Sequence, residues 1–174
     1  MDLRYPIGEF KYDGPNTREQ QAVLIDQIDE EPRNLCEAVK DLFPEQLDTP
    51  YRPDGWTVRQ VTHHLADSHL NSYVRFKWTL TEEEPTIKAY DEVRWSDLDD
   101  ARSAPPEVSL LLLEALHRRR ILLLRSLTAA DFKRTYRHRH TGLMTLDKAL
   151  SLYAWHGRHH ISHITSLREK LGWQ

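Results

Sequence analysis

The stretch Leu152-Tyr-Ala-Trp-His-Gly-Arg-His-His-Ile-Ser-His163 has the pattern of one helix and carries four histidines within about two turns. The four are His156, His159, His160 and His163. At about 100° per residue their side chains fall within an arc of about 100° and point into one volume. Imidazoles gathered in one volume are what a metal site requires.

A second group of histidines lies in another predicted helix and consists of His63, His64 and His69. Imidazole suits zinc, nickel, copper and iron, and histidines at i and i+4 commonly present two nitrogens from one helix. Two such ligands do not close a coordination sphere. We therefore expect a third ligand from a facing helix, which completes an open site.

Composition limits the classes of protein that this chain can belong to. Its 174 residues are enough for one core, so we expect a single domain over residues 1–174. With 24 basic and 27 acidic residues the net charge is −3, which disfavours nucleic-acid binding, and Arg118-Arg119-Arg120 is predicted to be solvated helix surface.

Neither secretion nor membrane insertion is expected. The first residues contain no apolar segment, and the most apolar stretch, Leu110 to Leu127, is interrupted by charged residues. The one cysteine, Cys36, has no partner for an internal disulfide, which fits a reducing compartment. We therefore expect a cytoplasmic protein with no membrane partner.

Four long helical patterns separated by proline-rich breaks predict an all-α four-helix bundle, and the low count of 6 glycines disfavours an all-β fold. The segment Pro44 to Gly55 is predicted to be a loop. The expected helices cover about Thr17–Leu42, Trp56–Thr81, Glu107–Leu127 and Thr145–Leu171.

Two connections depart from a minimal bundle. Residues 83–106 form a long connection between the second and third helices, with one short helix expected around Asp91–Asp99. Before the fourth helix, the alternation of Phe132, Arg134 and Tyr136 and the Thr141-Gly142 turn predict a small hairpin.

In the second helix, His64 lies at the edge of the apolar stripe, within a polar track suited to the wall of a cleft. This makes His64 a better inward ligand than His63. In the fourth helix two i, i+4 pairs compete, His156 with His160 and His159 with His163, and the helical wheel does not choose between them. The candidates for orienting ligands or passing protons are Gln60, Asp67, Asn71 and His160.

Several blocks of the chain, in order, resemble the DinB/YfiT-like family. They are Asp48-Thr-Pro-Tyr51, Gly55-Trp-Thr-Val-Arg-Gln60, His63-His-Leu-Ala-Asp-Ser-His69 and Tyr153-Ala-Trp-His-Gly-Arg-His-His-Ile-Ser-His163. The likeness runs from Tyr5 to Trp173. It implies a four-helix bundle, commonly a homodimer, that holds one divalent metal, zinc or nickel, on three histidines. By position in the family's pattern, these ligands fall on His64, His159 and His163.

The resemblance implies a metal-dependent hydrolase that acts on a small-molecule substrate. In it, three neutral imidazoles leave one coordination position for water. A small-thiol S-transferase, using a bacillithiol-like thiol at the metal, is the alternative within the family. A hypothesis of a different class is a metal-stabilised ligand-binding module, in which the histidines only stabilise the fold. The sequence does not separate these three.

Overall fold

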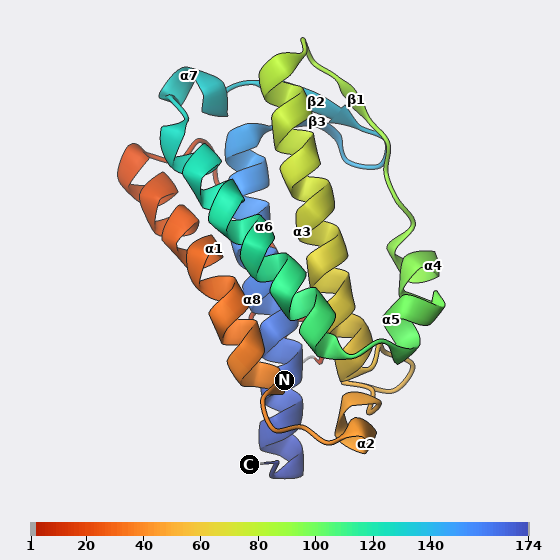
Figure 1. The fold of residues 1–174 in the computed structure, drawn as a ribbon. Helices are drawn as coiled ribbons and strands as arrows, with labels where there is room; N and C mark the ends of the chain where they lie inside the picture. The colour runs from red at the N-terminus through yellow and green to blue at the C-terminus, as the bar shows by residue number, and fades with distance from the viewer. Residues whose placement is uncertain (1–2, 174) are drawn as a thin grey trace.

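The computed structural model describes residues 3–173, so the ends of the expected domain, residues 1–2 and 174, lie outside it. Four long helices form the expected bundle, and the remaining elements are short (Figure 1). The long helices are α1 (Arg18–Val39), α3 (Val58–Thr81), α6 (Pro106–Ser126) and α8 (Leu146–Leu171). No described helix has the length and hydropathy that crossing a bilayer requires. The prediction of an all-α four-helix bundle is confirmed.

Local capping explains where these helices begin. The hydroxyls of Thr17 and Thr57 accept hydrogen bonds from the backbone amides of Gln20 and Gln60. In turn, the side-chain Oε1 of each glutamine accepts a hydrogen bond from the backbone amide of the capping threonine. Thr145 caps α8 in the same way through the Lys148 amide, without the return bond. These capping residues stand within one or two positions of the predicted helix starts. The segment Pro44 to Gly55 is not wholly a loop, because α2 (Pro44–Leu47) forms there with proline in its first turn.

The order of helices around the bundle differs from the order in the chain. α1 packs mainly against α8 and α6, while α3 packs mainly against α6 and α8, so consecutive long helices α1 and α3 lie diagonally. In Figure 1, α3 and α6 run in the same direction. The 24 residues of α3 span about 36 Å, so the chain must return that distance before α6 begins. This return explains the long connection.

Short elements occupy that return and one end of the bundle. The return contains β1 (Thr86–Ile87), α4 (Glu92–Ser96) and α5 (Asp99–Ser103), two short helices where one was expected. After α6 and α7 (Ala129–Phe132), the predicted hairpin is present as β2 (Thr135–His138) and β3 (Gly142–Thr145). β1 adds to β2 in parallel and makes a three-stranded sheet at the end of the bundle.

The core is divided by a buried polar layer. One apolar cluster, which includes Ile28, Phe76, Leu124 and Leu150, lies toward the sheet. The other lies toward the opposite end and includes Leu35, Leu65, Leu113 and Ile164. Between them each long helix contributes buried polar groups, among them Glu31, His69, Arg120 and His160. A polar layer across a bundle core is a natural place for a site, because its groups need partners other than water.

Candidate metal centre

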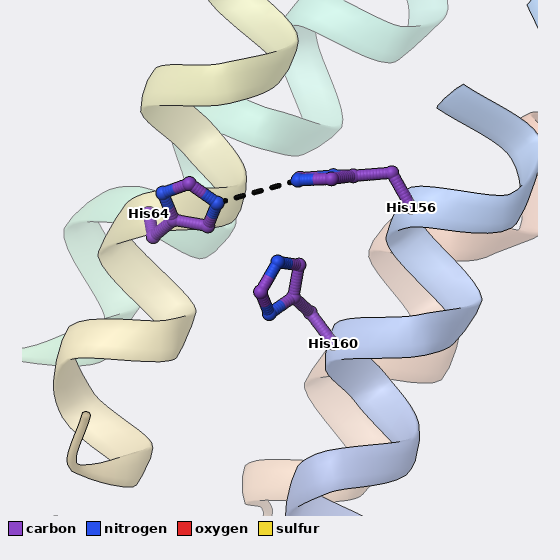
Figure 2. A group of neighbouring side chains, drawn as sticks. All are labelled: His64, His156 and His160. Atoms are coloured by element: carbon purple, nitrogen blue, oxygen red, sulfur yellow. Dashed lines mark hydrogen bonds between the residues drawn. The ribbon is translucent and has the colours of Figure 1, made fainter. Parts of the chain in front are cut away.

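Three histidines from two helices converge at this polar layer (Figure 2). His64 comes from α3, and His156 and His160 lie one turn apart on α8. One nitrogen of each lies within 4.8 Å of the other two. The Nε2 atoms of His64 and His156 are 3.3 Å apart. Two nitrogens bound at 2.0–2.1 Å to one tetrahedral metal are separated by about 3.3 Å, so this spacing fits a shared ion.

The hydrogen bonding and the protonation of these three histidines also suit metal ligands. The Nδ1 atoms of His156 and His160 are buried and have no hydrogen-bond partner in the described chain. Burial lowers the pKa of His64 to about 4 and the pKa values of His156 and His160 well below the usual histidine value. All three are therefore neutral at pH 7, the form in which imidazole binds a metal.

Aromatic neighbours hold the three rings in place. Trp56, just before the Thr57 cap of α3, lies 4.5 Å from the His64 ring and 6.1 Å from the His160 ring. On the other side, Tyr153 and His69 lie 5.9 and 5.7 Å from the His156 ring. Rings that are packed in this way present their nitrogens without the entropic penalty of ordering free side chains.

The other histidine pair of α8 faces a different part of the molecule. His159 stacks on Trp155 at 4.3 Å and lies beside Tyr5. His163 stacks on Tyr51 at 4.0 Å, and its Nε2 donates to the carbonyl of Arg4 at 3.2 Å. His159 thus packs on its own helix and on the N-terminal segment, and His163 packs on the segment before α3.

The structure therefore does not gather the ligand set that the family pattern implies. His159 and His163 approach each other and His160, all on α8, whereas His64 approaches His156 and His160. The two pairs on α8 are rotated by about 60° from one another, and only one of them faces α3. The set of His64, His159 and His163 stays a prediction that this geometry does not support.

A cavity of about 450 Å³ opens onto the three histidines. This volume is within the usual range for a small-molecule site. Besides His64, His156 and His160, its wall is formed by residues from α3, from the return segment, from the hairpin and from the start of α8. They include Ser68, Arg75, Tyr90, His138 and Tyr153.

The polar track of α3 is only partly in this cavity. Gln60 closes the capping box with its Oε1 and donates from Nε2 to the carbonyl of Ser96, so both ends of its amide are used. Asn71 donates to the carbonyl of Asp67, one turn back on the same helix. Of the four predicted catalytic candidates, only His160 lines the cavity. Burial raises the pKa of Asp67 to about 6, and its carboxylate acts electrostatically on Tyr90 of the cavity wall.

A second buried cluster lies behind His156 and was not predicted. Glu31 Oε2 is 3.3 Å from His69 Nδ1 and 3.8 Å from His117 Nε2. Arg120 donates to His69 Nδ1 at 3.2 Å and to Ser72 at 2.9 Å. Burial raises the pKa of Glu31, and the guanidinium of Arg120 acts in the opposite direction. With a cation already bonded to His69 Nδ1, this cluster is less suited to a metal than the first.

Arg120 corrects the expectation that Arg118-Arg119-Arg120 is solvated surface, since its side chain is fully buried. The signal was its place on α6, where His117, Arg120 and Leu124 follow inward helical spacing. Glu31 has the same signal on α1, between the inward residues Ile28 and Leu35. A charge at an inward position indicates a buried polar partner.

Comparison with known proteins finds relatives over the length of this sequence. A sequence profile of the DinB superfamily matches residues 27–164. Proteins of Bacillus cereus (strain 03BB102) and Bacillus thuringiensis subsp. konkukian (strain 97-27), both carrying the name "Putative metal-dependent hydrolase", are 55% identical over 172 residues, covering 99% of each chain.

Among solved structures, the chain is similar to YfiT from Bacillus subtilis, with a TM-score of 0.97 and 52% identity over 100% of both chains. That protein is described as a probable metal-dependent hydrolase with an unusual four-helix bundle topology. The profile match and these full-length relatives show that the chain belongs to the DinB superfamily.

Proposed function

We propose that this protein is a metal-dependent hydrolase that holds one divalent cation, zinc or nickel, on His64, His156 and His160. The observation that carries the proposal is the convergence of these three neutral imidazoles from two helices at the wall of a cavity. Relatives named as metal-dependent hydrolases support the reaction class. This ligand set takes the place of His64, His159 and His163.

The chain's own residues define what the site would do. Three protein ligands would leave one coordination position of the cation free, as in catalytic zinc sites. When bound, the cation supplies a Lewis acid that lowers the pKa of a coordinated water or thiol. Trp56 and Tyr153 fix the rings, and the hydroxyls of Ser68 and Tyr90 on the wall are available to orient a substrate.

The proposal is tested by a screen of esters, amides and phosphoesters with zinc- or nickel-loaded protein, metal-free protein and His156→Ala. Hydrolysis by the loaded wild type alone supports a hydrolase. In parallel, small thiols are offered with an electrophilic acceptor. Consumption of thiol that depends on the metal, with no hydrolysis, would replace the proposal by S-transfer.

We also propose that the protein forms a homodimer through the outer face of α6. Its exposed apolar residues share one arc of the helix. They are Val108, Leu111, Leu112 and Leu122, between 45% and 74% exposed. A second copy of the chain would remove this stripe from water.

A further inference from the structure

Arg75 is a buried cation on the wall of the histidine cavity. It lies on α3, three turns beyond His64, and only 8% of its surface is exposed. Its guanidinium reaches Tyr153 on α8 and lies over Tyr90 of the return segment, and both of these residues also line the cavity.

The contacts of Arg75 leave its charge without a counter-charge. One terminal nitrogen donates to the hydroxyl of Tyr153 at 3.0 Å, and the guanidinium lies 6.0 Å from the centre of the Tyr90 ring. Its Nε is buried without a hydrogen-bond partner. Within residues 3–173 it takes part in no ion pair. Glu92, which also lines the cavity, is exposed and is not bonded to it.

Arg120, another of the three buried arginines among the described residues, shows the contrast. Arg120 is fully buried too, but it lies in the polar layer beside Glu31 and bonds His69 and Ser72. A guanidinium keeps its charge in proteins, and a buried charge without a partner is strongly unfavourable. Arg75 differs from Arg120 in facing a cavity large enough for a small molecule.

We propose that Arg75 binds an anionic group, a carboxylate or a phosphate, carried by the substrate of the metal centre. A guanidinium matches both groups, because its fork of donors meets two oxygens at once. Tyr153 adds a second donor, since its oxygen accepts from Arg75 and its own proton is left for the ligand. That the anion belongs to a substrate rests on the proposed function, whereas the anion site itself does not.

The test uses calorimetric titration of the metal-loaded protein with inorganic phosphate, acetate and acetamide at constant ionic strength. Acetamide has the shape of acetate without its charge. We expect an anion to bind and acetamide not to bind, and the preference between phosphate and acetate identifies the source of the charge. Arg75→Gln is expected to lower the anion affinity about tenfold or more, and Arg75→Lys by less.

Arg139→Gln is the matched control, because Arg139 is exposed and lies between the cavity residues His138 and His140. It removes the same charge from the neighbourhood and should change affinity by less than about twofold. An equal loss in Arg75→Gln and Arg139→Gln, or equal binding of acetate and acetamide, overturns the proposal. If Arg75→Gln does not fold, the proposal is tested by the anion affinity of Arg75→Lys and by the comparison of acetate with acetamide.

Two further arms separate this inference from the proposed function. His156→Ala removes a proposed metal ligand but should keep the part of anion binding that Arg75→Gln abolishes. In the hydrolysis screen, an ester that carries a carboxylate should be preferred over its neutral analogue, and Arg75→Gln should remove that preference by raising KM. Hydrolysis without this preference retains the hydrolase and rejects the anion site. Anion binding without any hydrolysis retains the anion site and rejects the hydrolase.

Discussion

His64 and His156 stand 92 positions apart in the chain, yet their Nε2 atoms lie 3.3 Å apart. Two imidazole nitrogens at this distance need a proton or a cation between them, because two lone pairs repel. The diagonal placement of α1 and α3 makes α3 and α8 direct neighbours, which brings these rings together. The topology of the bundle is therefore what builds the site.

The first prediction separates the two histidine pairs of α8. Alanine at His64, His156 or His160 should abolish stoichiometric binding of zinc or nickel, because an open site with two remaining imidazoles binds weakly. Alanine at His159 or His163 should leave one metal per chain, since these rings pack on Trp155 and Tyr51. Equilibrium dialysis followed by elemental analysis measures the occupancy.

Circular dichroism of each variant is the control for folding. Loss of metal in His159→Ala and His163→Ala, with retention in His156→Ala and His160→Ala, would restore the ligand set implied by the family pattern.

The second prediction concerns acid stability of the metal-free chain. Burial lowers the pKa of His117 to about 3, whereas an unfolded histidine titrates near 6.5. Between these pH values the unfolded chain binds more protons than the folded chain, so stability is complete above about pH 6.5 and falls as the pH drops. Between pH 7 and pH 5, His117 alone contributes roughly 2 kcal/mol to this loss. Urea unfolding at pH 7 and pH 5 measures it.

Other buried groups modify the size of the effect. His69 and His160 act in the same direction, while Glu31 and Asp67 act in the opposite one, because burial raises their pKa values. The comparison that isolates His117 is His117→Gln, whose stability should fall less between pH 7 and pH 5. Identical pH profiles for the two proteins would rule out His117 as the source.

The third prediction distinguishes an enzyme with a preformed site from a module that the metal folds. The two apolar clusters hold all four long helices together without any of the three proposed ligands. Chelation should therefore preserve most of the helical dichroism. It should lower Tm by about 5–10 °C, as expected when a ligand at 100 times its Kd is removed. Collapse of the helical signal on chelation would favour the module.

The fourth prediction addresses the apolar stripe of α6. The double substitution Leu111→Glu and Leu122→Glu introduces charges at two positions that are 67% and 74% exposed, so the folded chain should tolerate them. The mass measured by light scattering should change from dimer to monomer. Leu143→Glu, at an exposed apolar position on the hairpin, should leave the mass unchanged. A wild type that is already monomeric would reject the interface.

Much of the fold could be predicted from the sequence because its signals are local. Thr17, Thr57 and Thr145 cap the helices that follow them, and Gly172 ends α8 in the left-handed conformation. β1 gives no such signal, since two residues pair with β2 about 50 positions away. Its existence depends on where the return segment meets the hairpin, and a local pattern does not contain that information.

The site shows the same division between local and tertiary information. The spacing of the histidines on α8 predicts that this helix carries metal ligands. Which pair is used depends on the direction in which α3 lies from α8, and both pairs have identical i, i+4 spacing. The position of Arg75 was equally unpredictable, because the sequence does not show that this charged side chain of α3 lines a cavity.

The fifth prediction tests the close approach of α1 and α8. Alanine normally stabilises a helix interior relative to glycine by roughly 0.5–1 kcal/mol. At Gly157, however, an added Cβ would collide with the carboxylate of Glu31. Gly157→Ala should therefore destabilise the protein by about 1–3 kcal/mol, the usual effect of overpacking. Thr165→Ala, at an exposed position of the same helix, should be neutral or slightly stabilising.

The double variant Gly157→Ala with Glu31→Ala identifies the collision as the cause. Glu31→Ala alone is destabilising, because it removes the carboxylate beside Arg120 and leaves a buried cation. In the double variant the added methyl group enters the space that the carboxylate left. In urea unfolding, the double variant should therefore lose less stability than the sum of the losses in the two single variants. Additive effects would mean that Gly157 is required for a reason other than contact with Glu31.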